Sequence, residues 1–365
     1  MLELPKILIH EHLDCSVRPE TMLDLWSQIG FEKAPPQAFP QESLKLWQES
    51  LNQRDSEKAS ELRKQAAALF AHNLQEQSSK SLAQYVQAIV EYILPVMQTK
   101  EELRRITKER IEDAVKDGII AMELRFAPQL HTLGNPADGN VLSLDEAMAA
   151  IIEATSNSPI PVKLGLCTLR HQPDSVCEQL VELAIKYRPH VGFFDLAADE
   201  AAHPGVLPWW ASHIEKLREN GIKITCHLWE TDNPTTKDIE AIHKYELKRL
   251  GHGIRVGETP GLDGVVFEVC PTSNIVTGQI SSMDKHPINA MYKAGRLVTV
   301  NTDGTLLTGT TLSKEYEKVA KCFSWTAADF LATNLNALAA SSFDDNVKQK
   351  LSEQLKLGYA ASSRV

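Results

Sequence analysis

Short apolar runs alternate with longer polar stretches along the chain. The runs are rich in β-branched residues, as expected of strands buried on both faces. They occupy eight segments: 6–10, 118–126, 162–167, 191–197, 222–229, 247–253, 265–271 and 296–303. Most stretches between them have helical patterning. In 143–155, for example, Ser143 is a candidate N-cap with Glu146 three residues later.

Eight strand–helix units in succession favour an α/β fold, a closed (β/α)8 or TIM barrel, that forms one domain over residues 1–365. An open doubly wound sheet is the alternative, but no glycine-rich phosphate loop follows an early strand. Residues 30–115 are too long for one crossover and predict several helices, most clearly at 55–75 and 81–97. We expect them to form a helical lid, inserted after the first strand, over one end of the barrel.

A second irregularity lies at 254–264, between the sixth and seventh apolar runs. This stretch is too short for a full crossover helix. Either the connection is unusually tight, or the strand boundaries there differ from those the pattern predicts.

Composition limits the class of partner. The 365-residue chain has a formal net charge of -10, which argues against nucleic acid or anionic membranes as general partners. No apolar stretch approaches the roughly 20 residues of a membrane span, and the start, MLELPKILIH, lacks the basic end of a signal peptide. The six cysteines are scattered without a C-x-x-C pair. These features predict a cytoplasmic protein.

Metal-binding residue types gather where the predicted strands end. His10 and His12 end the first run at positions i and i+2, which point to one face of a strand. His227 lies near the end of the fifth run, and Asp303 ends the eighth. The carboxyl ends of barrel strands meet at one face, where active sites are built. Three imidazoles and one carboxylate suit a divalent ion such as zinc, with a position left for a nucleophilic water.

Two further strand-end residues can move protons. Glu230 lies three residues after His227, and His252 stands between two glycines that allow a tight turn. Each residue taken alone is equally consistent with a surface or core polar group. The set of strand-end residues together points to a hydrolytic metal centre.

Longer motifs carry a resemblance to a known family. They include LPKILIHEHLDCSVRPETMLDL, ELRFAPQLH, FFDLAADE, LGHGIRV, FEVCPTSNIVTGQI and VNTDGTLLTGTTLSKEYE, which extend over nearly the whole chain. With these motifs the chain resembles the adenosine deaminases, particularly the bacterial ones, within the metal-dependent amidohydrolase superfamily. The resemblance implies one zinc ion per chain. It also implies hydrolysis of adenosine or 2′-deoxyadenosine to inosine or 2′-deoxyinosine and ammonia.

The resemblance also assigns roles to individual residues. It implies that the protonated Glu230 acts on purine N1, that His252 orients the attacking water, and that Asp14 holds a ribose hydroxyl. The helices near 60–95 correspond to the lid. The zinc ligands it implies are His10, His12, His227 and Asp303, the last also belonging to the catalytic set.

Departures from the family pattern all fall around the substrate. Cys15 replaces a usual glycine, and Ala198 stands where a glycine offers its amide to purine N3. Trp229 adds bulk between His227 and Glu230, and Gly304 replaces an Asp or Asn that contacts N7. These changes keep open a different 6-aminopurine as substrate, namely adenine or an N6- or 5′-modified adenosine.

Two other classes remain as alternatives. One is a purine-binding protein with a vestigial site, and the other is an amide or phosphoester hydrolase on the same barrel. The other zinc base-deaminase family is excluded, because its P-C-x-x-C motif does not occur in the chain.

Overall fold

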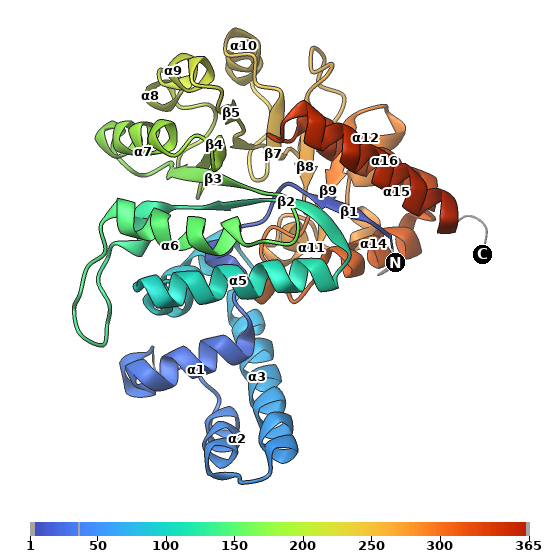
Figure 1. Ribbon diagram of the computed structural model, residues 1–365. Coiled ribbons are helices and arrows are strands. Elements are labelled where there is room, and N and C mark those ends of the chain that lie inside the picture. Colours follow the sequence, from blue (N-terminus) through green and yellow to red (C-terminus); the bar gives the residue numbers. More distant parts are fainter. Residues whose placement is uncertain (1–3, 36, 363–365) are drawn as a thin grey trace.

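Parallel strands form the centre of the molecule, in a computed structural model that describes residues 4–35 and 37–362. They pair in the orders β1-β2-β3-β4-β5 and β6-β7-β8-β9, and every pair is parallel. Figure 1 shows the resulting curved sheet with helices around it. The strands are β1 (Lys6–Leu8), β2 (Ile119–Phe126), β3 (Val162–Leu169), β4 (Val191–Ala197), β5 (Lys223–Ile224), β6 (His227–Leu228), β7 (Arg249–His252), β8 (Val266–Val269) and β9 (Leu297–Val300).

The two strand groups form one barrel. β5 and β6 are two halves of the predicted fifth strand, separated by Thr225 and Cys226. The last strand returns to the first just beyond their ends, where the Asp303 amide donates to the His10 carbonyl (3.1 Å) and the His12 amide to the Asp303 carbonyl (2.6 Å). The eight predicted strands and the (β/α)8 arrangement are therefore confirmed.

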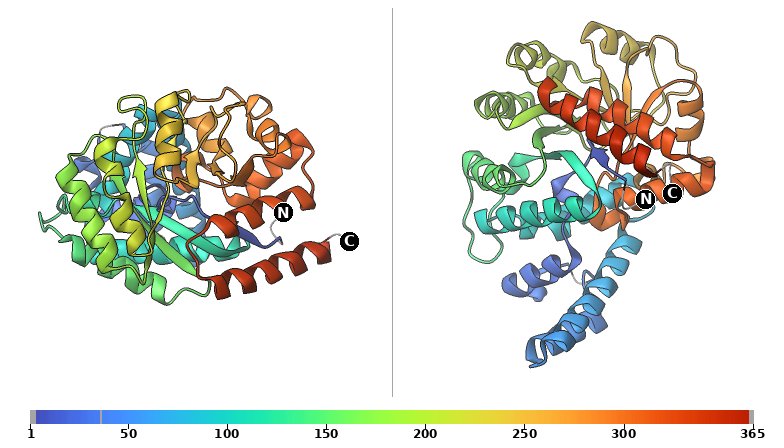
Figure 2. Two further views of the ribbon diagram at one scale, coloured as in Figure 1. Left: turned by 90° about the horizontal axis from the view of Figure 1, so that it is seen from above. Right: turned by 45° about the vertical axis from the view of Figure 1, so that its right-hand side comes forward.

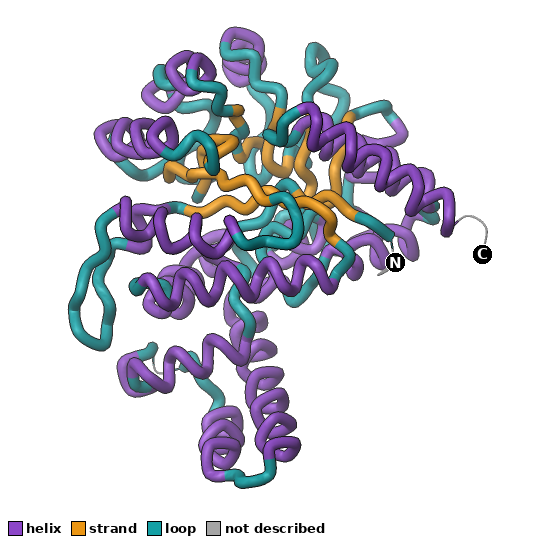
Figure 3. The backbone as a smooth tube through the Cα atoms, viewed as in Figure 1, coloured by secondary structure: helices purple, strands orange, loops and turns teal. Residues whose placement is uncertain are grey.

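Helices cover the outside of the sheet, as the views in Figures 2 and 3 show. The predicted capping box of Ser143 and Glu146 begins the helix after β2. Among the described residues, no helix lies between β7 and β8, so that crossover is indeed tight. The helices from α6 onward are α6 (Leu144–Ser156), α7 (Asp174–Lys186), α8 (Pro208–Ala211), α9 (Ile214–Glu219), α10 (Thr236–Lys244), α11 (Pro271–Val276), α12 (Ile288–Lys293), α13 (Thr305–Thr308), α14 (Leu312–Phe323), α15 (Ala327–Ala340) and α16 (Asp345–Ser362).

The long insertion between β1 and β2 is helical. Its α-helices are α1 (Pro19–Ile29), α2 (Gln41–Asn52), α3 (Ser56–Ser78), α4 (Leu82–Ala88) and α5 (Lys100–Lys116). The continuous helix expected over 81–97 is broken: α4 is followed by a π turn at Ile89–Ile93 and a 3-10 turn at Leu94–Val96. Pro95 lies in that last turn, and proline cannot donate the backbone hydrogen bond that continues a helix.

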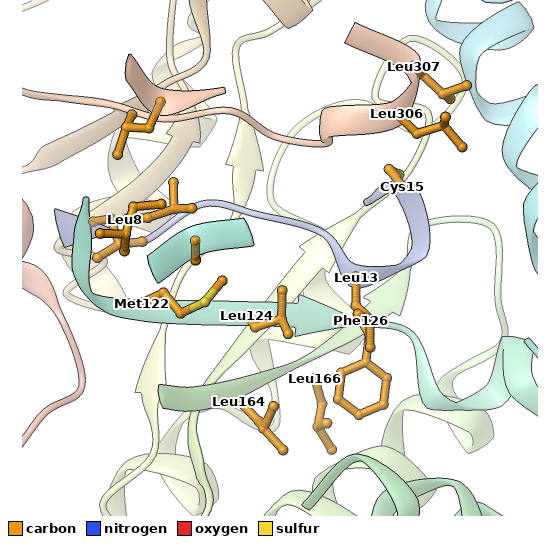
Figure 4. Close-up of a cluster of buried hydrophobic side chains, with 14 of the residues drawn as sticks. Leu8, Leu13, Cys15, Met122, Leu124, Phe126, Leu164, Leu166, Leu306 and Leu307 are labelled. Carbon is orange, nitrogen blue, oxygen red and sulfur yellow. The ribbon is translucent and has the colours of Figure 1, made fainter. Parts of the chain in front are cut away.

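Apolar side chains fill the space between the strands and the surrounding helices. Leu8, Met122, Leu124 and Leu164 are almost completely buried and lie together in Figure 4. Strands buried on both faces give the near-continuous apolar runs seen in the sequence. Within the described ranges, no helix has the length and apolar character needed to cross a bilayer.

Candidate active site

Four side chains converge where β1, β6 and β9 end. One ligand atom from each of His10, His12, His227 and Asp303 lies within 4.8 Å of the others. The Nε2 atoms of His12 and His227 are 3.2 Å apart. The Nε2 of His10 is 3.2 Å from Oδ1 of Asp303. The structure therefore brings together the four residues predicted as ligands.

Buried partners orient three of these ligands from behind. Nδ1 of His10 contacts Oε2 of Glu268 at 2.9 Å, and Nδ1 of His227 contacts Oδ2 of Asp195 at 3.0 Å. The Ser273 hydroxyl donates to Oδ2 of Asp303 at 2.6 Å. With Nδ1 donating to a carboxylate, each imidazole presents the Nε2 lone pair inward, as metal-bound histidines do.

An orphaned atom tests whether this set fits a metal. Nε2 of His10 is buried and makes no well-formed hydrogen bond among the described residues, and its neighbour at 3.2 Å, Oδ1 of Asp303, is itself a predicted ligand. A buried polar atom without a partner is unfavourable, and a cation at this point would satisfy it. Three imidazoles and a carboxylate are also the donors that zinc prefers. The residues fit a single zinc ion.

A second group of donors shares two of these residues. His252 and Cys270 lie near His10 and Asp303 within the same 4.8 Å limit. The Cys270 thiol, however, donates to the Glu268 carbonyl at 3.5 Å, and Nδ1 of His252 is bonded to Asn274 at 3.0 Å. These contacts leave the set containing His12 and His227 as the better metal site.

One buried arginine joins the two carboxylates behind the histidines. Arg125 on β2 contacts Asp195 at 2.9 Å and Glu268 at 2.6 Å, and all three side chains are fully buried. Arg249 contacts Glu268 from the other side at 2.6 Å. Burial alone would raise the pKa of both carboxyls, but these cations and His227 hold it well below the usual range. Both carboxyls therefore remain ionised acceptors for the imidazoles.

Glu230 and His252 lie side by side next to this group. Nε2 of His252 is 3.5 Å from Oε2 of Glu230, and the amide of Asn274 donates to Nδ1 of His252. Burial, with the charges of Asp303 and Glu200, raises the pKa of Glu230 to about 8. Burial lowers the pKa of His252 well below its usual value. At neutral pH Glu230 is a protonated acid and His252 a neutral imidazole.

Glu200, for whose side chain the sequence predicts no role, fixes the turn that carries Glu230. Its buried carboxylate accepts from the backbone amides of Trp229 (2.6 Å), Glu230 (2.9 Å) and Thr231 (3.0 Å). These three bonds anchor the backbone of Glu230 to the loop after β4.

The strand ends are locally strained. Ala198, Trp229, His252 and Asp303 all have positive φ, between 58° and 78°, a conformation that costs non-glycine residues free energy and is common at functional sites. This geometry corrects the expectation for Trp229. Its indole is fully buried and donates to Asp238 at 3.3 Å, so it adds bulk beneath the turn and is not part of the cavity lining.

A cavity of about 890 Å³, including its open mouth, lies over the converging residues. Asp14 and Ala198 line it, as do His12, His227, Glu230, His252 and Asp303. Asp14 is held by the Ala127 amide (3.0 Å) and by His131 (2.8 Å). The outer wall is aliphatic and comes from α4 and the following π turn: Leu82, Val86, Ile89 and Val90.

Only part of the insertion adjoins the cavity. Residues of α4 and the π turn line it, whereas α2 and α3 project away from the barrel (Figure 1). That the insertion forms a lid over one end of the barrel stays a prediction.

Gly304 lies behind the lining. A Cβ atom at this position would be 2.4 Å from Cβ of Cys15 and 2.9 Å from the Tyr85 hydroxyl. Cys15 and Tyr85 line the cavity at this point. Cys15 and Tyr85 therefore occupy the space that a side chain at position 304 would need.

Sequence reasoning missed the residues that support the ligands. Asp195, Glu268 and Arg125 come from β4, β8 and β2 and meet only in the closed barrel. One signal was present: each is a charged residue inside an otherwise apolar run, such as VGFFDLA or VVFEVCP. Charged residues are rarely fully buried unless paired, so such positions indicate ion pairs within the barrel.

Comparisons with known protein sequences point to one family. A sequence model described as adenosine deaminase matches residues 56–357. An adenosine deaminase of Clostridium acetobutylicum is 31% identical, over 97% of this chain and 98% of that protein.

Solved structures support the same fold. An adenine deaminase from Arthrobacter aurescens has a TM-score of 0.77 at 18% identity, covering 99% of this chain and 100% of its own. A cog1816 amidohydrolase from Burkholderia ambifaria, with bound Zn, has a TM-score of 0.73 at 21% identity, covering 100% and 93%. With the family match over most of its length, this chain belongs to the adenosine deaminase family and is an aminohydrolase.

Proposed function

We propose that this chain removes the 6-amino group of adenosine or 2′-deoxyadenosine by hydrolysis, with one zinc ion held by His10, His12, His227 and Asp303. The observation that carries the proposal is the convergence of this ligand set with Glu230 and His252 below one cavity. The zinc in the Burkholderia structure supports the choice of metal. Zinc in such a site lowers the pKa of water and so supplies a nucleophile near neutral pH.

The residues of the chain then handle the protons. Water adds its oxygen to C6 of the purine and N1 gains a proton. The remaining water proton passes to the amino group, the C6–N bond breaks, and the group leaves as ammonia. Glu230, protonated at neutral pH, is the donor to N1. Because Nδ1 of His252 accepts from Asn274, its Nε2 carries the proton and can donate to the oxygen that adds to C6.

The cavity lining favours a substrate without a phosphate group. Among the described residues, neither lysine nor arginine lines it. Phosphate groups in proteins are usually bound by such side chains or by helix N-termini. The aliphatic wall of α4 instead suits a nucleoside. Asp14, held in place by His131, is an acceptor for a ribose hydroxyl.

A substrate panel tests the proposal. Zinc-loaded protein is assayed for ammonia release from adenosine, 2′-deoxyadenosine, adenine, AMP and 5′-modified adenosines. We expect kcat/KM to be highest for the two nucleosides and at least about 100-fold lower for AMP, since an unpaired buried phosphate charge costs several kcal/mol. Turnover of adenine or a modified adenosine alone would overturn the choice of substrate. No ammonia from any of them would overturn the activity.

A further inference from the structure

The cavity contains a polar group that the proposed reaction does not use. Tyr85 lies on α4 and lines the cavity, yet it is only 4% exposed. Its hydroxyl is buried and has no nitrogen or oxygen partner among the described residues, while the thiol of Cys15, a weak hydrogen-bonding group, lies beside it. Buried hydroxyls are normally bonded. The other side chains that line this cavity have no such orphaned atom, so the Tyr85 hydroxyl is the group that a ligand would satisfy.

Two residues beside Tyr85, Cys15 and Gly304, leave no room for a side chain at position 304. Gly304 has φ of −158°, an extended conformation open to any residue, so backbone strain does not require glycine here. Space requires it, because a Cβ would lie 2.4 Å from Cβ of Cys15 and 3.2 Å from its carbonyl oxygen. While Cys15 is present, residue 304 cannot place a side chain beside the ligand. Figure 4 shows Cys15 close to Leu306 of the helix that follows Gly304.

The barrel topology places Tyr85 opposite the catalytic acid. Cys15 follows the first strand and Gly304 the eighth, and these two strands are neighbours. Glu230 follows β6, the fifth strand, which in a ring of eight is diametrically opposite the first. A 6-aminopurine has N1 on one side of C6 and N7 on the other. If Glu230 faces N1, the N7 edge faces Tyr85.

We propose that the Tyr85 hydroxyl donates a hydrogen bond to N7 of the aminopurine, and that the close packing of Cys15 on Gly304 leaves the space in which it does so. This inference rests on the proposed function. Burial raises the pKa of Tyr85 well above its usual value, so the hydroxyl keeps its proton. N7 of an aminopurine has a lone pair and no hydrogen, which makes it an acceptor for such a donor.

The test removes the two partners separately. Tyr85→Phe keeps the ring and its packing but deletes the hydroxyl, and a 7-deaza purine replaces N7 with C–H. The dissociation constants of inosine and 7-deazainosine are measured by calorimetry on zinc-loaded protein. Wild type should prefer inosine about 5- to 150-fold, the factor for one hydrogen bond of about 1–3 kcal/mol to a buried partner. In Tyr85→Phe the preference should fall below about twofold.

A matched control comes from the same segment. Tyr92, in the π turn, is bonded to Gln77 at 3.4 Å and is not part of the cavity lining. Tyr92→Phe should keep the wild-type preference. A preference unchanged in Tyr85→Phe, or lost equally in Tyr92→Phe, would overturn the inference. These results are distinguishable from a failure of the proposed function, in which wild type releases no ammonia from any aminopurine.

A second arm tests the packing. Gly304→Ala should lower the thermal unfolding midpoint and weaken inosine binding, because the new methyl group conflicts with Cys15. Adding Cys15→Gly in the same chain should recover part of both losses, since the contacts of the new methyl group with the Tyr85 hydroxyl and the Cys15 carbonyl remain. If Gly304→Ala has no effect, or if the two substitutions are simply additive, Cys15 does not keep position 304 free of a side chain.

Discussion

Arg125 offers the sharpest test of how the barrel supports the metal ligands. Its fully buried guanidinium contacts Asp195 at 2.9 Å and Glu268 at 2.6 Å, and it donates to the Ile9 carbonyl at 2.7 Å. Arg125→Met preserves most of the volume and removes the charge. Glu268 would retain Arg249. Among the described residues, Asp195 would retain as partners the imidazole of His227 and the thiol of Cys167.

We expect Arg125→Met to lower both the free energy of unfolding and the affinity for zinc, because Asp195 loses its cationic partner. Removing one partner of a buried ion pair costs about 3–5 kcal/mol because the remaining charge is uncompensated. This is a large share of the roughly 5–15 kcal/mol that stabilises a typical domain. Because Asp195 and Glu268 hold the outer nitrogens of His227 and His10, zinc affinity should also fall by about 10- to 100-fold.

Denaturant unfolding measures the free energy of unfolding, and competition with a chelator measures the zinc affinity. The control substitution is Arg104→Met. Arg104 is 37% exposed and pairs with Glu153 at the surface. It should cost less than about 1 kcal/mol and leave zinc affinity unchanged. If Arg125→Met behaves like Arg104→Met in both assays, the reasoning about the buried network is refuted.

Other substitutions separate metal binding from proton transfer. His227→Ala should abolish zinc binding and activity together, measured as metal content and ammonia release; full zinc content would contradict its role as a ligand. Glu230→Gln should retain zinc but lower kcat by about 10²- to 10⁴-fold, because an amide cannot give up a proton to N1. Wild-type activity should fall as pH rises through about 8, since Glu230 donates only while protonated below its pKa. The residual rate of Glu230→Gln should lack that decline, and an identical decline would assign it to another group.

Local patterns were sufficient to predict most of the fold and the ligand set. A strand buried on both faces is apolar along most of its length, so each barrel strand is recognisable on its own. Because parallel strands bring their carboxyl ends together, His10, His12, His227 and Asp303 could be combined without knowing the structure.

The residues around the substrate depend on facts that local sequence does not contain. The sequence predicts that Trp229 adds bulk between His227 and Glu230. In the structure its backbone has φ of 60°, and its indole points toward Asp238. Gly304 reads as a missing side chain, but its space is occupied by Cys15, which is distant in sequence. Tyr85 is one position of the helix predicted at 81–97, and only the packed structure shows that its buried hydroxyl has no nitrogen or oxygen partner among the described residues.

Titration of metal-free protein with Zn²⁺, followed by ammonia release from adenosine, tests the central claim most directly. The four-ligand site predicts that activity rises in proportion to added zinc and reaches a plateau at one equivalent per chain. Activity that is complete without metal, or that never develops although one equivalent of zinc is bound, would contradict the account.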